Sequence, residues 1–400
     1  MPADRVLDVS LVLLGAALPL SLAVTNGALA LLSIGLLLAL ADRTSRARAK
    51  AALKAAARTP LFAALALYAA ASLVSGLAGV GPEKSLSIWP KDLHKLWVAL
   101  AVGAALDERR RVLFARGLAA GAFAAALIGL GQTAAAIHGM ATARSIEEHE
   151  TALSVIRAHA FIHPVSFGES MGLSFLGLLF AGEAFLPLAT RRWAAAVVAL
   201  VLVANQTRAA QLGVVVGFAA VAALRPRWRR AFAAVVVAAL AVAAGWEFVV
   251  PHGRSLRDLL TFQGPQAVRF TLWNVAARMF ADHPWTGAGP GHYKTLFTTY
   301  FNGLLDSERD WGNAHNLFLH QAAERGLLGL SALLAVAGAI GTGVWRRVRE
   351  NTDGWALWAL ASCAAFLVMN MTETAFQTEQ VATLFLVIVL LPAAARPARS

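Results

Sequence analysis

Charged residues are scarce in this chain of 400 residues, because they make up 14% of the sequence against 58% for hydrophobic residues. A soluble protein of this length carries charge at roughly a quarter of its positions. The shortage excludes an ordinary soluble domain and indicates a polytopic membrane protein.

Cysteine is almost absent as well. Cys363, the only one, lies within a hydrophobic run, so the chain has no intrachain disulfide and the thiol is most simply a core residue. His159 and His163 are four residues apart, which suits a metal pair on a helix, but Pro164 disfavours helix there. No cysteine or well-placed carboxylate completes the set, and we expect no metal site.

The sequence also lacks the motifs that bind nucleotides. The stretch Gly287–Gly291 has neither the spacing of a dinucleotide fingerprint nor the Lys-Ser/Thr ending of a phosphate-binding loop, so it predicts a turn. The acidic residues nearby form no DxD pair that would hold a metal-bound nucleotide sugar. We therefore expect no cofactor.

The excess of positive charge, +12 at pH 7, raises nucleic acid as a partner. Its placement argues against that, because most lysines and arginines stand in short clusters between hydrophobic runs, as in membrane proteins. Membrane lipids are the expected partner, and nucleic acid is not.

Hydrophobic runs dominate what is present, and a helix needs about 20 mostly apolar residues to cross a bilayer. No small-residue cleavage site follows the run Leu11–Val24, so we expect a retained first span rather than a signal peptide. The predicted fold is an all-α polytopic membrane protein, with residues 1–400 forming one membrane domain of about twelve spans. The predicted spans are 9–25, 27–41, 60–80, 91–106, 112–136, 166–188, 192–205, 208–224, 231–250, 320–344, 354–371 and 378–393.

Basic clusters set the predicted orientation. With these spans, every cluster falls on one face, which is then cytoplasmic, and both termini lie there too. The opposite face carries a smaller loop, 137–165, and a large one, 251–319. The clusters are 43–58, 107–111, 191–192, 225–230, 346–349 and 396–399.

The large loop, between the ninth and tenth predicted spans, is the main candidate for function, since long loops are usually functional. His283-Pro284 is expected to end a first loop helix. Asn313 is expected to cap a second helix, which breaks at Gly326 and leads into the tenth span. The first helix is predicted to lie on the membrane surface from four residues at helical spacing: Phe270, Trp273, Ala277 and Phe280.

Three external arginines are candidate phosphate ligands. Arg208 stands between two hydrophobic runs, where an arginine costs about 2.5–3.5 kcal/mol on insertion scales and so should have a partner or a task. Either it binds phosphate or it reaches the lipid head groups. Arg269, four residues before Trp273, either binds phosphate or is simply exposed at the membrane interface. Arg157 is either a further phosphate contact or a surface charge.

His315 is the candidate base. In the first turn after an Asn313 cap, the helix dipole would disfavour a protonated imidazole and leave a neutral base. The alternative is a polar residue at a wet helix end. His320 and Glu324, four residues apart, are expected to support one another.

Further polar residues lie at the external ends of the predicted spans. Lys91, His94 and Lys95 share a helical face, and they either anchor to anionic lipid or meet a substrate phosphate. Glu373 and Glu379 either pair with the external arginines or are solvated.

Several blocks of sequence follow one another in a fixed order. Upstream are FIHPVSFG (Phe161–Gly168) and NQTR (Asn205–Arg208), and Arg269-x3-Trp273 opens the large loop. HPWTGAGPGHY (His283–Tyr293), AHNLFL (Ala314–Leu319) and ERGLLG (Glu324–Gly329) complete the series. In order and topology these blocks resemble the O-antigen ligase and polymerase superfamily of bacterial envelope proteins.

The resemblance implies a metal-independent glycosyltransferase with a membrane fold of the type-C class. Its donor would be a glycan on undecaprenyl diphosphate and, in the ligase branch, its acceptor lipid A–core oligosaccharide. The reaction belongs to lipopolysaccharide biosynthesis, on the periplasmic side of the bacterial inner membrane. Carried over by motif, the arginines that contact the diphosphate are Arg208 and Arg269, and the essential histidine is His315. Supporting contacts are expected from Arg157, Asn316, Trp273, Lys91 and Lys95.

Two alternatives to the ligase stay open. A polymerase of the same superfamily would join repeat units on the lipid carrier. A polysaccharide transporter or flippase would carry charged residues and broken helices at the midplane, whereas the predicted spans are almost free of charge. The compact length and the single dominant late loop favour a ligase that inverts the anomeric centre.

Overall fold

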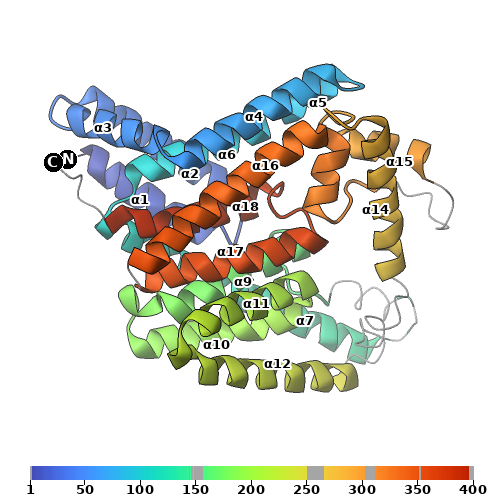
Figure 1. Cartoon of the computed structure of the whole chain (residues 1–400). Helices are drawn as coiled ribbons and strands as arrows, with labels where there is room; N and C mark the ends of the chain where they lie inside the picture. Colours follow the sequence, from blue (N-terminus) through green and yellow to red (C-terminus); the bar gives the residue numbers. More distant parts are fainter. Residues whose placement is uncertain are drawn as a thin grey trace.

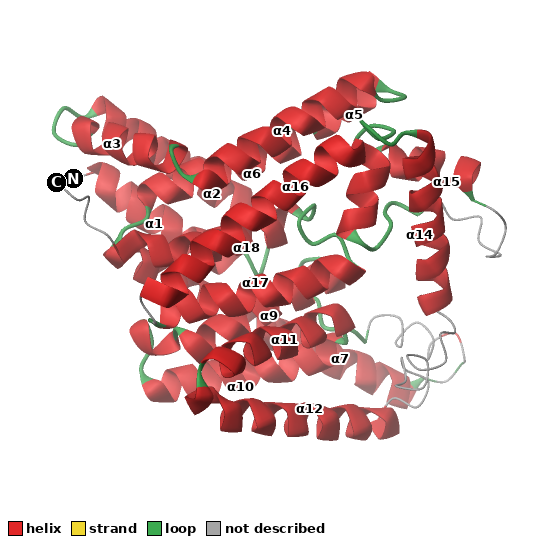
Figure 2. Ribbon diagram, in the orientation of Figure 1, coloured by secondary structure: helices red, strands yellow, loops and turns green. Residues whose placement is uncertain are grey.

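The computed structural model of the chain describes residues 2–143, 145, 147, 156–249, 265–301, 311–350 and 353–395. Within these ranges every regular element is a helix, as Figure 2 shows. Much of the large predicted loop and of the 137–165 loop lies outside the described residues, including His149.

Predicted hydrophobic segments coincide with helices except the first, 9–25, which covers the end of α1 (Pro2–Ala17), a turn and the start of α2 (Leu22–Ala41). Six of the described helices are long and apolar enough to cross a membrane, and three shorter apolar helices accompany them. The structure thus confirms a helical chain with several candidate spans, while the count of about twelve crossings stays a prediction. The helices are α1 (Pro2–Ala17), α2 (Leu22–Ala41), α4 (Pro60–Ala78), α6 (Pro90–Ala105), α7 (Glu108–Thr142), α9 (Pro164–Phe180), α10 (Leu188–Asn205), α11 (Arg208–Leu224), α12 (Arg229–Val249), α16 (Leu317–Glu350), α17 (Gly354–Thr372) and α18 (Glu379–Leu390).

The long helices run side by side, and the two ends of the bundle differ (Figure 1). Both chain termini and α3 (Arg46–Ala57) lie at one end. The other end carries α5 (Pro82–Ile88), α14 (Pro265–Asp282) and α15 (His292–Tyr300), with α14 lying crosswise to the bundle. The predicted loop helix is α14, and it ends just before His283-Pro284 as expected.

Glycines allow the closest helix pairs in the bundle. A Cβ on Gly217 of α11 would lie 2.5 Å from the carbonyl oxygen of Ala361 in α17, and one on Gly121 of α7 would lie 2.1 Å from the oxygen of Ala16 in α1. Small residues let helix backbones approach in this way, which is the usual source of packing energy in lipid.

The long helix α16 is kinked at Gly326, where φ is 60° and ψ is −162°. The kink frees backbone groups on both sides, and residues 284–289 satisfy them. Ala288 and Gly289 donate their N–H groups to the carbonyls of residues 323 and 324, at 3.0 and 2.9 Å. The N–H groups of residues 327 and 328 donate in return to the carbonyls of residues 284 and 285, at 2.8 and 3.0 Å. The predicted break at Gly326 and the predicted Gly-rich turn are therefore parts of one interlocked unit.

The apolar face predicted for α14 does not pack on other helices, and its contact with the membrane surface stays a prediction. Phe270 is 52% exposed, and Ala277 is exposed as well. The face that packs on α15 and α16 is one step round the helix and consists of Leu272, Val275, Ala276 and Met279. Aromatic residues at helical spacing mark a face, but the position of the packing partners decides which face is buried.

Candidate active site

The carboxylate of Glu373 joins two residues that the sequence singled out. Its Oε2 lies 2.6 Å from Nδ1 of His315, and its Oε1 accepts a hydrogen bond from Nη2 of Arg269 at 3.1 Å. Arg269 and Glu373 are 104 residues apart in sequence, and His315 and Glu373 are 58 apart. The structure therefore brings the predicted base and one predicted phosphate ligand to a single acidic group.

Glu373 and His315 are placed by the ends of two helices. Glu373 ends α17, and its backbone N–H donates to the carbonyl of Met369 at 2.8 Å. Asn316 donates from Nδ2 to the carbonyl of Met371 at 3.1 Å, which ties the start of α16 to the end of α17.

The expected helix cap is wrong by three residues. Asn316, not Asn313, caps α16, because its Oδ1 accepts the N–H of Leu319 at 3.0 Å. His315 thus precedes the helix rather than occupying its first turn, and its backbone is left-handed with φ 45°. Asn313 has a different task, since its Oδ1 accepts the N–H of His315 at 2.8 Å and closes this turn. The helix-dipole argument for a neutral His315 does not apply at this position.

Arg269 stands in the second turn of α14, and its side chain is 26% exposed. Trp273, one turn further on, is half-buried and meets the edge of the Phe270 ring at 5.4 Å between centroids. Arg278 lies on a different face of the helix, is exposed, and donates to the carbonyl of Tyr300 at 3.4 Å. Only Arg269 among these is directed to Glu373.

Arg157 braces the turn between α10 and α11. Its Nε donates to the carbonyl of Asn205 at 3.0 Å, and its Nη2 donates to Oγ1 of Thr207 at 2.7 Å. Asn205 in turn donates to the carbonyls of Ala158 and Pro164, both at 2.7 Å. Arg208 is half-buried and is the first residue of α11, so it directly follows this braced turn.

The charges of Arg157 and of the Glu373 carboxylate act on His163 in opposite directions. His163 precedes α9, and its Nδ1 accepts the N–H of Val165 at 3.3 Å. Burial lowers the pKa of His163, and the positive charge of Arg157 lowers it further, while Glu373 acts in the opposite direction. The helix begins only at Pro164, as predicted, so His159 and His163 do not share a helical turn.

The expected surface role of Lys95 is wrong. Lys95 is 3% exposed, and its Nζ lies 3.1 Å from Oδ1 of Asp92. His94 is near Oε1 of Glu379 at 3.7 Å, and Lys91 alone is exposed. A lysine near the membrane surface usually extends to water, but a carboxylate on the same side of α6 holds this one inside.

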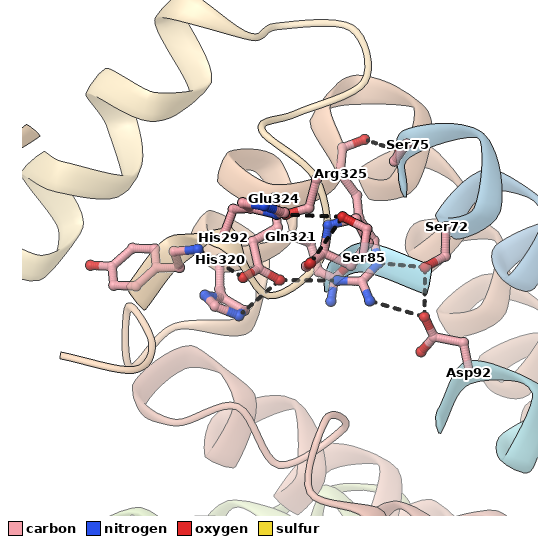
Figure 3. A network of polar contacts seen from close by, with 12 residues as sticks. Ser72, Ser75, Ser85, Asp92, His292, His320, Gln321, Glu324 and Arg325 are labelled. Atoms are coloured by element: carbon pink, nitrogen blue, oxygen red, sulfur yellow. Dashed lines mark hydrogen bonds and ion pairs between the residues drawn. The ribbon is translucent and has the colours of Figure 1, made fainter. Parts of the chain in front are cut away.

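Arg325 is the centre of the buried network to which Lys95 belongs (Figure 3). Its Nη2 donates to Oδ2 of Asp92 at 2.9 Å, and its Nε donates to Oγ of Ser72 at 3.0 Å. Glu324 contacts Arg325 and His320, each at 3.4 Å, which confirms the expected support between Glu324 and His320. These contacts fix α4, α6 and the first part of α16 to one another.

Asp92 and Arg325 have no role in the sequence analysis. Of the two roles left open for Glu373, the structure confirms pairing with an arginine, Arg269. A signal for the network was present, because an ionisable residue within an apolar segment should have a partner. Asp92 stands three residues before Lys95, which is one helical turn.

Residues 193–334 match the family model for O-Antigen ligase. This match supports membership of the chain in the O-antigen ligase/polymerase superfamily. The matched region runs from α10 into α16 and contains Arg208, Arg269 and His315, while Arg157 and Glu373 lie outside it. No curated protein sequence matches the chain. The match supports a glycosyltransferase-like function of the ligase or polymerase class, and the family implies lipid-linked polysaccharide substrates in general.

Proposed function

We propose that the chain is an O-antigen ligase. It transfers a glycan from undecaprenyl diphosphate to lipid A–core oligosaccharide, at the periplasmic face of the bacterial inner membrane with both termini cytoplasmic. The observation that carries the proposal is the meeting of Arg269 and His315 at Glu373, within a superfamily whose substrates are lipid-linked polysaccharides.

The reaction is a displacement at the anomeric carbon of the donor sugar. His315 takes the proton from an acceptor hydroxyl, and the oxygen of that hydroxyl forms a bond to the anomeric carbon. The bond from this carbon to the diphosphate breaks, and its electron pair leaves with undecaprenyl diphosphate. Attack from the face opposite the diphosphate inverts the anomeric centre.

Arg269 and Arg208 bind the diphosphate in this proposal, with Arg157 as a further contact. Guanidinium groups match phosphate geometry and stabilise the charge that develops on the leaving group. Arg157 already donates to the turn before Arg208, so its more immediate effect is to position Arg208. Trp273 and Asn316 support the site from α14 and from the start of α16.

Transport is a weaker explanation, although the predicted spans contain more buried charge than expected. Buried ionisable residues occur in α6, α9 and α16: Asp92, Lys95, Glu169, His320, Glu324 and Arg325. All of them lie within the first nine residues of their helices. A transporter site is expected near the bilayer midplane, whereas this charge gathers toward one end of the bundle, the end with α5, α14 and α15.

Deletion of the gene separates ligase from polymerase. Loss of a ligase leaves lipid A–core uncapped while full-length polymer accumulates on the carrier. Loss of a polymerase leaves single repeat units attached to lipid A–core, and that outcome would contradict the proposal. Both products are resolved by gel analysis of lipopolysaccharide and of extracted carrier-linked glycan.

Complementation with variants tests the assigned residues. His315→Ala should abolish transfer at a normal protein level, and retained transfer would exclude His315 as the base. Arg208→Ala and Arg269→Ala should weaken donor use more than acceptor use. Arg278→Ala is the matched control, because Arg278 shares α14 with Arg269 but is exposed and does not contact Glu373. Equal, mild effects of all three arginine variants would favour interfacial anchoring instead.

A further inference from the structure

Glu373 offers one carboxylate oxygen to each of two partners. Oε2 faces Nδ1 of His315, and Oε1 accepts from a single guanidinium nitrogen of Arg269. An arginine guanidinium carries five N–H donors, so the contact with Glu373 leaves others for a ligand. Arg269 can therefore hold Glu373 and a phosphate group at the same time.

The contact with His315 sets the ring's tautomer. An ionised carboxylate only accepts hydrogen bonds, so the hydrogen between Glu373 and His315 is carried on Nδ1. In the neutral ring Nε2 then has the free lone pair and is the atom able to accept a proton. A carboxylate that holds a histidine in this way also stabilises the imidazolium formed after proton transfer.

Stability alone gives little reason for this group of charges. The side chains are 26%, 13% and 27% exposed for Arg269, Glu373 and His315. Ion pairs reached by solvent contribute about 0–1 kcal/mol. The buried network at Arg325, which is 2% exposed, already fixes α16 to its neighbours.

We propose that Glu373 is a positioning residue that holds the base and a diphosphate-binding arginine as one unit. This assignment rests on the proposed function. Through Oε2 it keeps His315 with Nε2 free for the acceptor hydroxyl, and through Oε1 it fixes Arg269 relative to that base. The distance between the point of proton removal and the leaving group is thereby set by one side chain.

Local anchoring suits Glu373 to this task. Its backbone is held to Met369, and the chain just before it is held to Asn316, the residue next to His315. The titratable groups of the described residues that interact electrostatically with the unit are His163, Glu169 and His320, and Arg157 acts on His163. None of them occupies the position between His315 and Arg269 in the described structure, where Glu373 contacts both.

The test is transfer by the purified full-length protein in proteoliposomes, with undecaprenyl-diphosphate-linked glycan and lipid A–core as substrates. Glu373→Gln keeps the shape of the side chain but not its charge, and kcat should fall roughly 100- to 10,000-fold, as for other carboxylates that orient a catalytic histidine. The loss should appear in kcat more than in the KM for the acceptor, because the substituted side chain no longer holds the base in position. Glu373→Asp keeps the charge and should recover part of the rate.

Glu379→Gln is the matched control, since Glu379 lies six residues further on and faces His94 instead. It should leave kcat and the KM for the acceptor unchanged. A structural role for Glu373 would lower the thermal midpoint of both Glu373 variants with no recovery of kcat in Glu373→Asp, and would overturn the proposal. If His315→Ala retains transfer, the base assignment and this proposal both fail. If His315→Ala is inactive and Glu373→Gln has native kcat, only the positioning role fails.

Discussion

A methyl group on Gly326 would lie 2.6 Å from the backbone nitrogen of Gly287. The two glycines belong to the kink in α16 and to the turn that fills it, and both have positive φ, 60° and 71°. A Cβ on Gly287 would in turn lie 2.3 Å from the backbone nitrogen of Arg325, so each glycine leaves room for the backbone of the opposite segment.

Gly326→Ala should destabilise the protein by about 2–5 kcal/mol, from left-handed backbone strain together with overpacking. The measurement is thermal unfolding of the purified protein in detergent. Gly338→Ala is the control in the same helix, because a Cβ there meets no atom within 4 Å. An equal midpoint for the two variants would show that the interlock at the kink is not required.

The buried network makes a second prediction. Asp92→Ala leaves Arg325 and Lys95 without their shared carboxylate, and breaking a buried pair costs about 3–5 kcal/mol. The double variant Asp92→Leu/Arg325→Met should cost less than the sum of the two single changes. Arg109→Ala is the control, because Arg109 is 74% exposed and its pair with Asp8 should be worth about 0–1 kcal/mol. Strict additivity in the double variant would argue against direct coupling.

Packing of α11 on α17 gives a third prediction. Gly217→Ala places a Cβ 2.5 Å from the carbonyl oxygen of Ala361, and overpacking of this kind costs about 1–3 kcal/mol. Gly131→Ala in α7 is the control, since nothing lies within 4 Å of its Cβ. The lower thermal midpoint should appear for Gly217→Ala alone, and its absence would mean that the two helices can separate without loss.

Two substitutions should move the pKa of His163 in opposite directions. Arg157→Met removes a charge that lowers this pKa and should raise it, whereas Glu373→Gln removes a charge that raises it and should lower it. Arg157→Lys keeps the charge and serves as the control. The measurement is an NMR titration of labelled histidine in micelles, with the His163 signal assigned by its loss in His163→Gln. Shifts of the same sign in the first two variants would place His163 away from one of these groups.

The sign for stability follows from the same pKa. His163 is protonated less readily in the folded protein than in the unfolded chain, because burial and Arg157 lower its pKa. Its contribution to folding is complete above the unfolded value of about 6.5 and is lost as the pH falls through the folded value. In His163→Gln, the fall in unfolding free energy between the unfolded and the folded pKa values of His163 should be absent, so stability should fall less as the pH is lowered.

The sequence predicts most of the helices because long apolar runs have few other structures available in a membrane. It does not predict α3, whose alanines are interrupted by four exposed basic residues, Arg46, Arg48, Lys50 and Lys54. Nor does it predict the break at residues 18–21, between α1 and α2, because the hydrophobic run continues through it. Apolar composition reports burial in lipid but not the points where the backbone turns.

The candidate site is only partly predictable for a related reason. Arg269 and His315 were found from their chemical type and their motifs, but Asn313 and Asn316 compete as helix caps, and only the three-dimensional contacts decide between them. Glu373 lies 58 residues beyond His315, and no local pattern connects the two. Asp92 lies one helical turn from Lys95, but no local pattern shows that Arg325 shares the same carboxylate inside the bundle.

The hydrogen bonds at the kink in α16 also define what can be exchanged between relatives. A chimera that replaced residues 284–289 alone, or the helix alone, would have to reproduce four backbone contacts made by the other partner. The smallest segment that carries both partners runs from Pro284 to Leu328, and it brings His315 with it. Because of these contacts, the turn, the histidine and the kinked helix should be exchangeable only together, as one segment.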